Sequence, residues 1–98
     1  RLAEALELVE KAVKLAPADA FIQDSLGWVQ YRLGRLDDAY RTLTAAYAAK
    51  RDPEIAAHLG EILWARGARD EALKLWREAV AESPENEALS TVLRKYQP

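Results

Sequence analysis

Apolar residues recur every three or four positions along most of the chain, which is the spacing of one face of an α-helix. In the first such segment, Leu2, Leu6 and Val9 share a face. No stretch alternates between apolar and polar residues as a β-strand does, so the sequence predicts an all-α fold. The expected helices cover about 1–16, 20–33, 36–49, 53–66, 69–82 and 87–96.

Residues that begin and end helices separate these segments. Asp19 and Asp52 are suitable N-caps, and Pro53 follows at a first helical position, where proline is tolerated. Gly34 and Gly67 stand just past a helix end, where glycine adopts the left-handed conformation at little cost. Every connection is short, so successive helices are expected to pack as antiparallel neighbours.

The segment 20–52 nearly recurs at 53–85. A fixed period of this length is typical of stacked helical repeats. No linker divides the chain, so residues 1–98 are expected to form one domain. The positions that return unchanged include Leu26 and Leu59, Gly27 and Gly60, Gly34 and Gly67, Ala39 and Ala72, and Ala46 and Ala79.

Gly27 and Gly60 lie inside predicted helices, where glycine costs about 0.5–1 kcal/mol relative to alanine. Its recurrence at one repeat position predicts close approach of the paired helix, with Ala39 and Ala72 as the facing small residues. A bulky residue in place of Gly27 is therefore expected to destabilise the fold by overpacking. The residues expected to fill each helix pair are Leu26, Leu43 and Ala46, and then Leu59, Trp76 and Ala79.

These recurring residues resemble the tetratricopeptide repeat (TPR), which has Leu-Gly in its first helix, a turn Gly, and then Ala, an aromatic residue, Ala and Pro. Residues 20–52 and 53–86 resemble two full repeats, the second with Pro84 at its boundary. Residues 1–17 resemble the second helix of a truncated repeat, and 87–98 resemble a closing helix. The resemblance implies a right-handed α-solenoid.

Some positions depart from the family pattern. Gln23 and Ala56 stand where the family prefers Trp, and Arg51 replaces Pro at the first repeat boundary. The repeats look similar to the C-terminal repeats of proteobacterial TPR proteins, some of which are outer-membrane lipoproteins, so a periplasmic or outer-membrane setting is one option. No targeting signal assigns a compartment. Residue 1 is Arg and the first repeat is incomplete, so we expect a piece of a longer protein.

In this family the first helix of each pair lines a concave groove that binds a peptide or helix of another protein. Aromatic residues and Arg dominate many interfaces, which favours such a surface here. Alternatively, Trp28, Trp64 and Tyr31 pack between neighbouring repeats. The family's carboxylate clamp is not expected, because Asp24 and Trp28 occupy the places of its Lys and Asn. The groove positions carried over are Phe21, Asp24, Trp28, Tyr31, Arg32, Glu54, Glu61 and Trp64.

Charge and composition argue against other functions. The net charge is −2 with both signs mixed, unlike a nucleic-acid binder, and the apolar runs are too short to span a membrane. His58 shares a helix face with Glu54 and Glu61, but a lone His is better explained as an inter-helix contact than as a metal site or part of a catalytic triad. We therefore expect no catalytic residues, no metal and no cofactor.

The sequence thus predicts a non-enzymatic protein interaction module that holds a partner's peptide or helix in the groove. The alternative is a structural cap of a longer TPR solenoid, which mediates assembly. In that case the apolar face of the first helix, which lacks its usual partner helix, is available for self-association.

Overall fold

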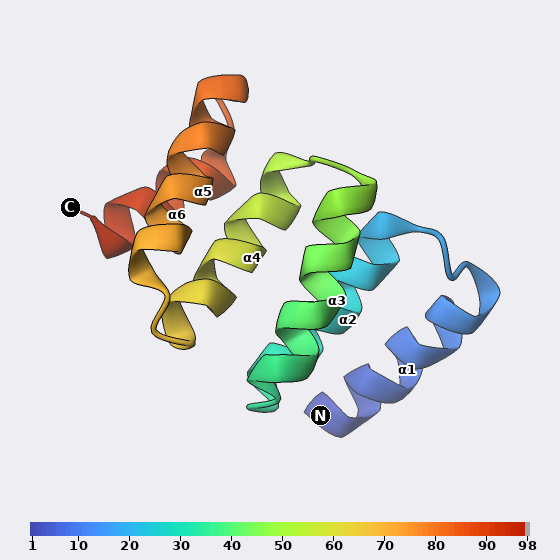
Figure 1. The fold of residues 1–98 in the computed structure, drawn as a ribbon. Coiled ribbons are helices and arrows are strands. Elements are labelled where there is room, and N and C mark those ends of the chain that lie inside the picture. The colour runs from blue at the N-terminus through green and yellow to red at the C-terminus, as the bar shows by residue number, and fades with distance from the viewer. Residues whose placement is uncertain (98) are drawn as a thin grey trace.

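The computed structural model describes residues 1–97, and these residues form six α-helices and no strand (Figure 1). The predicted all-α fold is confirmed, and each helix begins and ends within one residue of its predicted position. Pro98, the last residue of the predicted closing segment, lies outside the described residues. The helices are α1 (Leu2–Leu15), α2 (Ala20–Arg32), α3 (Leu36–Ala49), α4 (Pro53–Ala65), α5 (Arg69–Glu82) and α6 (Glu87–Tyr96).

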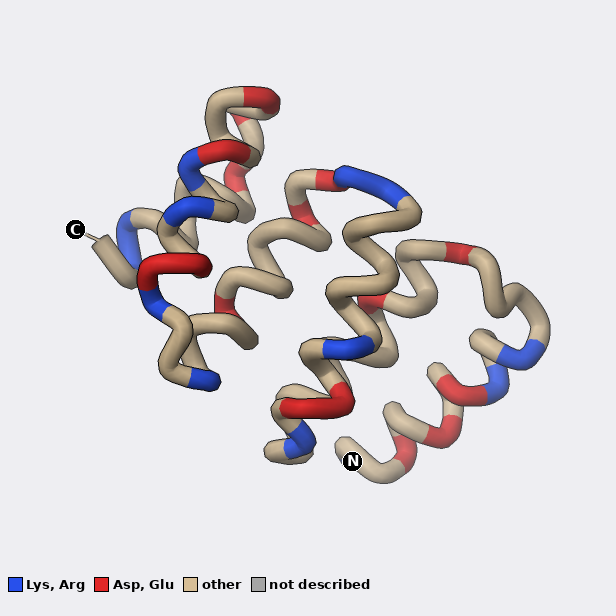
Figure 2. The backbone as a smooth tube through the Cα atoms, viewed as in Figure 1, with Lys and Arg blue, Asp and Glu red and all other residues tan. Residues whose placement is uncertain are grey.

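The helices stack as successive antiparallel pairs, as Figure 1 shows. The central helix, α4, contacts α2, α3, α5 and α6 and carries seven buried residues, whereas α1 carries none. Between Glu54 and Glu61 the sequence of α4 has no Asp, Glu, Lys or Arg, so this part of its tube is tan in Figure 2. The core of the molecule therefore lies along α4.

The first helices of successive pairs touch one another, because α2 contacts α4 and α4 contacts α6. The second helices do not: within residues 1–97, α1 does not contact α3, and α3 does not contact α5. The helices thus come together on one side of the stack and diverge on the other. We refer to the surface formed by α2, α4 and α6 as the first-helix face.

Local hydrogen bonds define where the helices begin and end. Asp19 accepts from the backbone N–H groups of residues 21 and 22, and Asp52 accepts from those of residues 54 and 55, at 2.9 and 3.2 Å in each case. Gly34 and Gly67 have φ of 82° and 89°. The N–H of the residue after each glycine donates to a carbonyl five residues earlier, which closes the helix end.

Large side chains fill the space above the two buried helical glycines. A Cβ added to Gly27 would lie 2.6 Å from Leu43 Cγ, and one added to Gly60 would lie 2.0 Å from Trp76 Nε1. Ala39 and Ala72, the small residues expected to face the glycines, are fully buried, but the side chains nearest to each glycine are Leu43 and Trp76. The missing Cβ makes room for the side chain one helical turn further along the partner helix, where Leu43 and Trp76 stand.

Candidate functional site: the first-helix face

An acid and a histidine join α2 to α4. Asp24 on α2 is only 8% exposed, and its Oδ1 and Oδ2 lie 2.8 and 3.0 Å from Nδ1 of His58 on α4. Because a carboxylate only accepts hydrogen bonds, the Nδ1–H of His58 donates to Asp24. The bond ties two successive first helices together in the middle of the face.

The indole of Trp28 covers this bonded pair. Trp28 stands one turn after Asp24 on α2, and its ring stacks on the His58 ring with centroids 4.3 Å apart. Tyr31 extends the cluster, because its ring centroid lies 5.0 Å from that of Trp28. Trp28 and Tyr31 are both half-buried, so part of each ring stays open to solvent.

The surroundings of His58 favour its charged form. Burial lowers the pKa of the imidazole, but the hydrogen bond and the charge of Asp24, followed by the charges of Glu61 and Glu54, together raise the pKa above 6.5. The side chain of His58 remains 33% exposed, so protons reach it from solvent.

A second acid joins α4 to α6. Glu61 accepts a hydrogen bond from the hydroxyl of Tyr96 at 2.7 Å, and the Lys95 ammonium donates to it at 3.4 Å. Burial and the bond to Glu61 raise the pKa of the Tyr96 phenol, so its proton stays in place near neutral pH. The ring of Trp64 lies against Tyr96 with centroids 4.9 Å apart.

An acid contacts a proton donor on the next first helix twice along the stack, from different positions in the two repeats. Asp24 meets His58 34 residues later in the chain, and Glu61 meets Lys95 at the same separation. Both α2 and α4 also present a Trp to an aromatic ring on the next first helix. We call these contacts the histidine rung, made by Asp24, Trp28 and His58, and the tyrosine rung, made by Glu61, Trp64, Lys95 and Tyr96.

Known proteins are similar to this chain in sequence and architecture. A TPR repeat-containing protein of Pseudomonas aeruginosa is 54% identical over 61 residues, which are 62% of this chain and 10% of that protein. The crystal structure of a thermophilic TPR protein in Thermus thermophilus aligns with a TM-score of 0.86 and 30% identity, over 96% of this chain and 48% of that one. The chain belongs to the tetratricopeptide repeat family.

A second curated relative of this TPR chain is a BBSome complex member of Bos taurus, 34% identical over 89 residues, which are 91% of this chain. The chain spans only 10% and 17% of the lengths of these two relatives. No protein-family model matches it. The relative in Pseudomonas agrees with the proteobacterial resemblance of the sequence. A TPR fold is in general a protein–protein interaction module, and TPR proteins are in general non-enzymatic scaffolds.

The structure spreads the predicted groove positions of the TPR chain over three environments. Three of these predicted positions form or flank the histidine rung, and two other positions belong to the tyrosine rung. Phe21 is 48% exposed and lies away from the rungs, with the Lys50 ammonium 5.6 Å from its ring centroid. Arg32 and Glu54 are exposed at an end of α2 and of α4. Asp24 and Trp28 belong to the histidine rung and Tyr31 flanks it, whereas Glu61 and Trp64 belong to the tyrosine rung.

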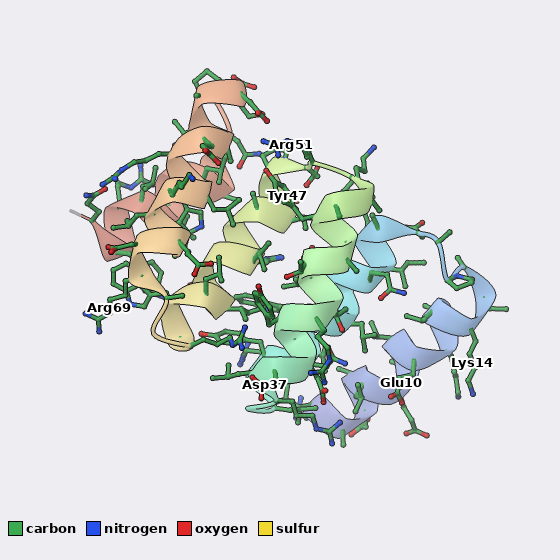
Figure 3. All side chains as sticks on the ribbon, in the orientation of Figure 1. Glu10, Lys14, Asp37, Tyr47, Arg51 and Arg69 are labelled. Atoms are coloured by element: carbon green, nitrogen blue, oxygen red, sulfur yellow. The ribbon has the colours of Figure 1, made fainter. Side chains whose placement is uncertain are left out.

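Sequence reasoning missed the partners of these residues. It placed His58 at an inter-helix contact without pairing it with Asp24, and it gave Tyr96 no role. The available signal was the separation of 34 residues between an acid and a proton donor on successive first helices. The ring of Trp64 also stacks on that of Trp76. The guanidinium of Arg69, a residue that Figure 3 labels, lies over the Trp64 ring.

The opposite side of the stack carries two clefts where the second helices diverge. One has a volume of about 350 Å³ and lies over Leu59 and Leu63, between Tyr40 on α3 and Glu78 on α5. The other, of about 420 Å³, is lined by Glu10, Val13, Lys14 and Leu26, of which Glu10 and Lys14 are labelled in Figure 3. Leu26 and Leu59, which stand at equivalent repeat positions, each line one of these clefts.

Residues 1–97 contain no group of three or more His, Cys, Asp or Glu side chains placed to hold a metal ion. Within the same range, no helix combines the length and the apolar character needed to cross a bilayer.

Proposed function

We propose that this TPR chain binds a peptide or helix of a partner protein along its first-helix face, without catalysing a reaction. The observation that carries the proposal is the pair of aromatic contacts on neighbouring first helices, Trp28 on His58 and Trp64 on Tyr96. These rings are half-buried, so they stand at fixed positions and still offer surface to a guest. Rings held in place before binding lose little conformational freedom on binding.

Polar residues flank the aromatic surface. Arg32 and Glu54 are exposed, and neither forms an ion pair within residues 1–97. Their charges are therefore available to a guest at the rim, where polar contacts set orientation. Asp24 and Glu61 have a different part in this proposal. Their carboxylates are engaged by the rungs, so they position the rings and do not touch the guest.

The experiment selects peptides from a displayed random library on the 98-residue chain and measures their Kd by fluorescence polarisation. Trp28→Ala and Arg32→Ala should each weaken binding at least tenfold, which corresponds to about 1.4 kcal/mol. Matched controls on the outer side, Lys74→Ala and Glu78→Ala, should leave the Kd unchanged. Circular dichroism checks that each variant is folded.

Two outcomes would contradict the proposal. The first outcome is that the library yields no peptide that binds. The second is that the selected peptides lose affinity for the Lys74 and Glu78 variants but keep their affinity for Trp28→Ala and Arg32→Ala. Arg32 matters most in this comparison, because it is exposed and its removal does not disturb the core.

A second candidate function is assembly through α1. The apolar face expected to be open, with Leu2, Leu6 and Val9, is half-buried. Leu8 and Leu15 lie seven residues apart on another face of α1, and they are 67% and 87% exposed. Large apolar side chains left in water favour association. Sedimentation at increasing concentration should show dimers or larger species that Leu8→Ser and Leu15→Ser together abolish. A chain that stays monomeric up to millimolar concentration excludes this candidate.

A further inference from the structure

The two rungs join successive first helices in the same way but differ in chemistry. In the tyrosine rung, the phenol and the ammonium both keep their protons near neutral pH. In the histidine rung, the donor is an imidazole, whose charge changes in the physiological range. Only one of the two joints between first helices can therefore respond to a modest change of pH.

We propose that the histidine rung is a pH-sensitive latch, which holds α2 against α4 and fixes Trp28 in the first-helix face while His58 is protonated. Loss of that proton loosens the latch. The existence of the latch does not depend on any partner. Its effect on partner binding rests on the proposed function.

The burial of Asp24 explains why the charge of His58 matters. The carboxyl side chain is only 12% exposed, so water solvates it poorly and His58 is its hydrogen-bond partner. A charged donor makes a shorter and stronger bond to a carboxylate than a neutral donor does. When His58 becomes neutral, Asp24 keeps a weaker bond and a buried charge with nothing to balance it.

The charges around the ring set the direction of the response. The main charges that act on His58 are Asp24 on α2 and Glu61 and Glu54 on α4, all of them acidic. They raise its pKa in the folded chain above the unfolded value of about 6.5. The stabilisation is therefore complete below about pH 6.5 and is lost as the pH rises through the folded pKa.

The stack of Trp28 on His58 connects the latch to the binding surface. The ring centroids are 4.3 Å apart with an angle of 27° between the planes. A protonated ring at this position attracts the electron-rich indole face, as a cation does. A neutral ring loses that attraction, so the position of Trp28 becomes less fixed as His58 deprotonates.

The test is an NMR titration of the 98-residue chain between pH 5.5 and 8.5. His58 is the only histidine, so its ring signals need no assignment. The pKa should lie above 6.5, and the indole N–H signal of Trp28 should move with the same midpoint. Asp24→Asn should lower the pKa of His58. Tyr96→Phe is the matched control, because it weakens the other rung without changing a charge and should leave the titration in place.

The proposal is overturned if His58 titrates at or below 6.5, if Asp24→Asn leaves its pKa unchanged, or if the Trp28 signal does not follow the titration. A selected library peptide should bind more weakly at pH 8.5 than at pH 6. Equal affinity at both values would overturn the link between the latch and binding. Failure of every peptide to bind would instead overturn the proposed function, while the titration still decides the latch.

Discussion

Replacing Gly60 with alanine tests the packing of the repeat most sharply. The new Cβ would lie 2.0 Å from Nε1 and 2.3 Å from Cε2 of Trp76, distances at which one of the groups must move. Trp76 is fully buried, and its indole N–H donates to the carbonyl of Ala57 at 3.3 Å. A rigid ring with no exposed edge has little room to move, so the two helices must separate or the hydrogen bond must break.

The expected loss of stability follows from three contributions. Overpacking a filled core costs about 1–3 kcal/mol. A buried indole N–H left without its acceptor costs a further ~1–3 kcal/mol. Alanine in place of glycine in the helix returns about 0.5–1 kcal/mol. We expect Gly60→Ala to lower the free energy of unfolding by about 3 kcal/mol, or Tm by about 12–24 °C for a domain of this size.

The assay is urea unfolding followed by far-UV circular dichroism. Gly27→Ala is the matched comparison, because its Cβ would meet the Leu43 side chain at 2.6 Å and no hydrogen bond is involved. A leucine adjusts more easily than an indole, so this variant should lose only about 0–1 kcal/mol. In a Trp76→Leu background, which copies the pair found in the first repeat, Gly60→Ala should cost less than in the natural chain.

Two results would refute this reasoning. The first is that Gly60→Ala is as stable as the natural chain. The second is that Gly60→Ala lowers the free energy of unfolding by the same amount with Leu at position 76 as with Trp. Either result would mean that the glycine does not make room for the Trp76 ring.

The remaining predictions concern helix ends and rungs. Asp52→Ala removes a cap from α4 and should cost about 1 kcal/mol in urea unfolding, and an unchanged midpoint would contradict the role of the cap. Gly67→Ala meets no neighbouring atom, yet it should cost about 1 kcal/mol because φ is 89°; a stability gain would exclude strain there. Tyr96→Phe should cost about 1 kcal/mol at every pH between 6 and 8.5. Unfolding of the natural chain should become easier across that interval as His58 loses its proton, whereas a flat profile would contradict the latch.

The fold could be predicted because its signals are local and repeated. Helix α4 begins at Pro53 because the carboxylate of Asp52 caps its first turn, and it ends before Gly67 because glycine adopts the left-handed conformation at little cost. Both signals lie within a few residues of the boundary they set. The same residues for helix starts and helix ends occur in both repeats at equivalent positions, so each repeat supported the interpretation of the other.

The contacts between helices could not be predicted in the same way. The sequence showed that Gly27 and Gly60 need a close neighbour, but the direction in which Leu43 and Trp76 project depends on how the paired helices cross. Ala39 and Ala72 are small and buried as expected, but the sequence did not show that a larger side chain one helical turn further along lies nearest to each glycine.

The pairing of Asp24 with His58 depends on how one repeat stacks on the next, which no local pattern records. The same holds for Arg51, which stands where the family has Pro. Its guanidinium reaches Glu82 on α5 at 2.9 Å and lies over the ring of Tyr47, as Figure 3 shows at the connection between α3 and α4. This departure from the family pattern therefore adds a contact between repeats.

The most direct test of the central claim is an NMR map of the binding surface. A peptide selected on the 98-residue chain is added to labelled protein, and the backbone and indole signals that change are assigned. The account predicts changes on α2, α4 and α6, centred on Trp28, Arg32 and Glu54. Changes confined to α1, α3 and α5, with the Trp28 indole signal unmoved, would contradict it.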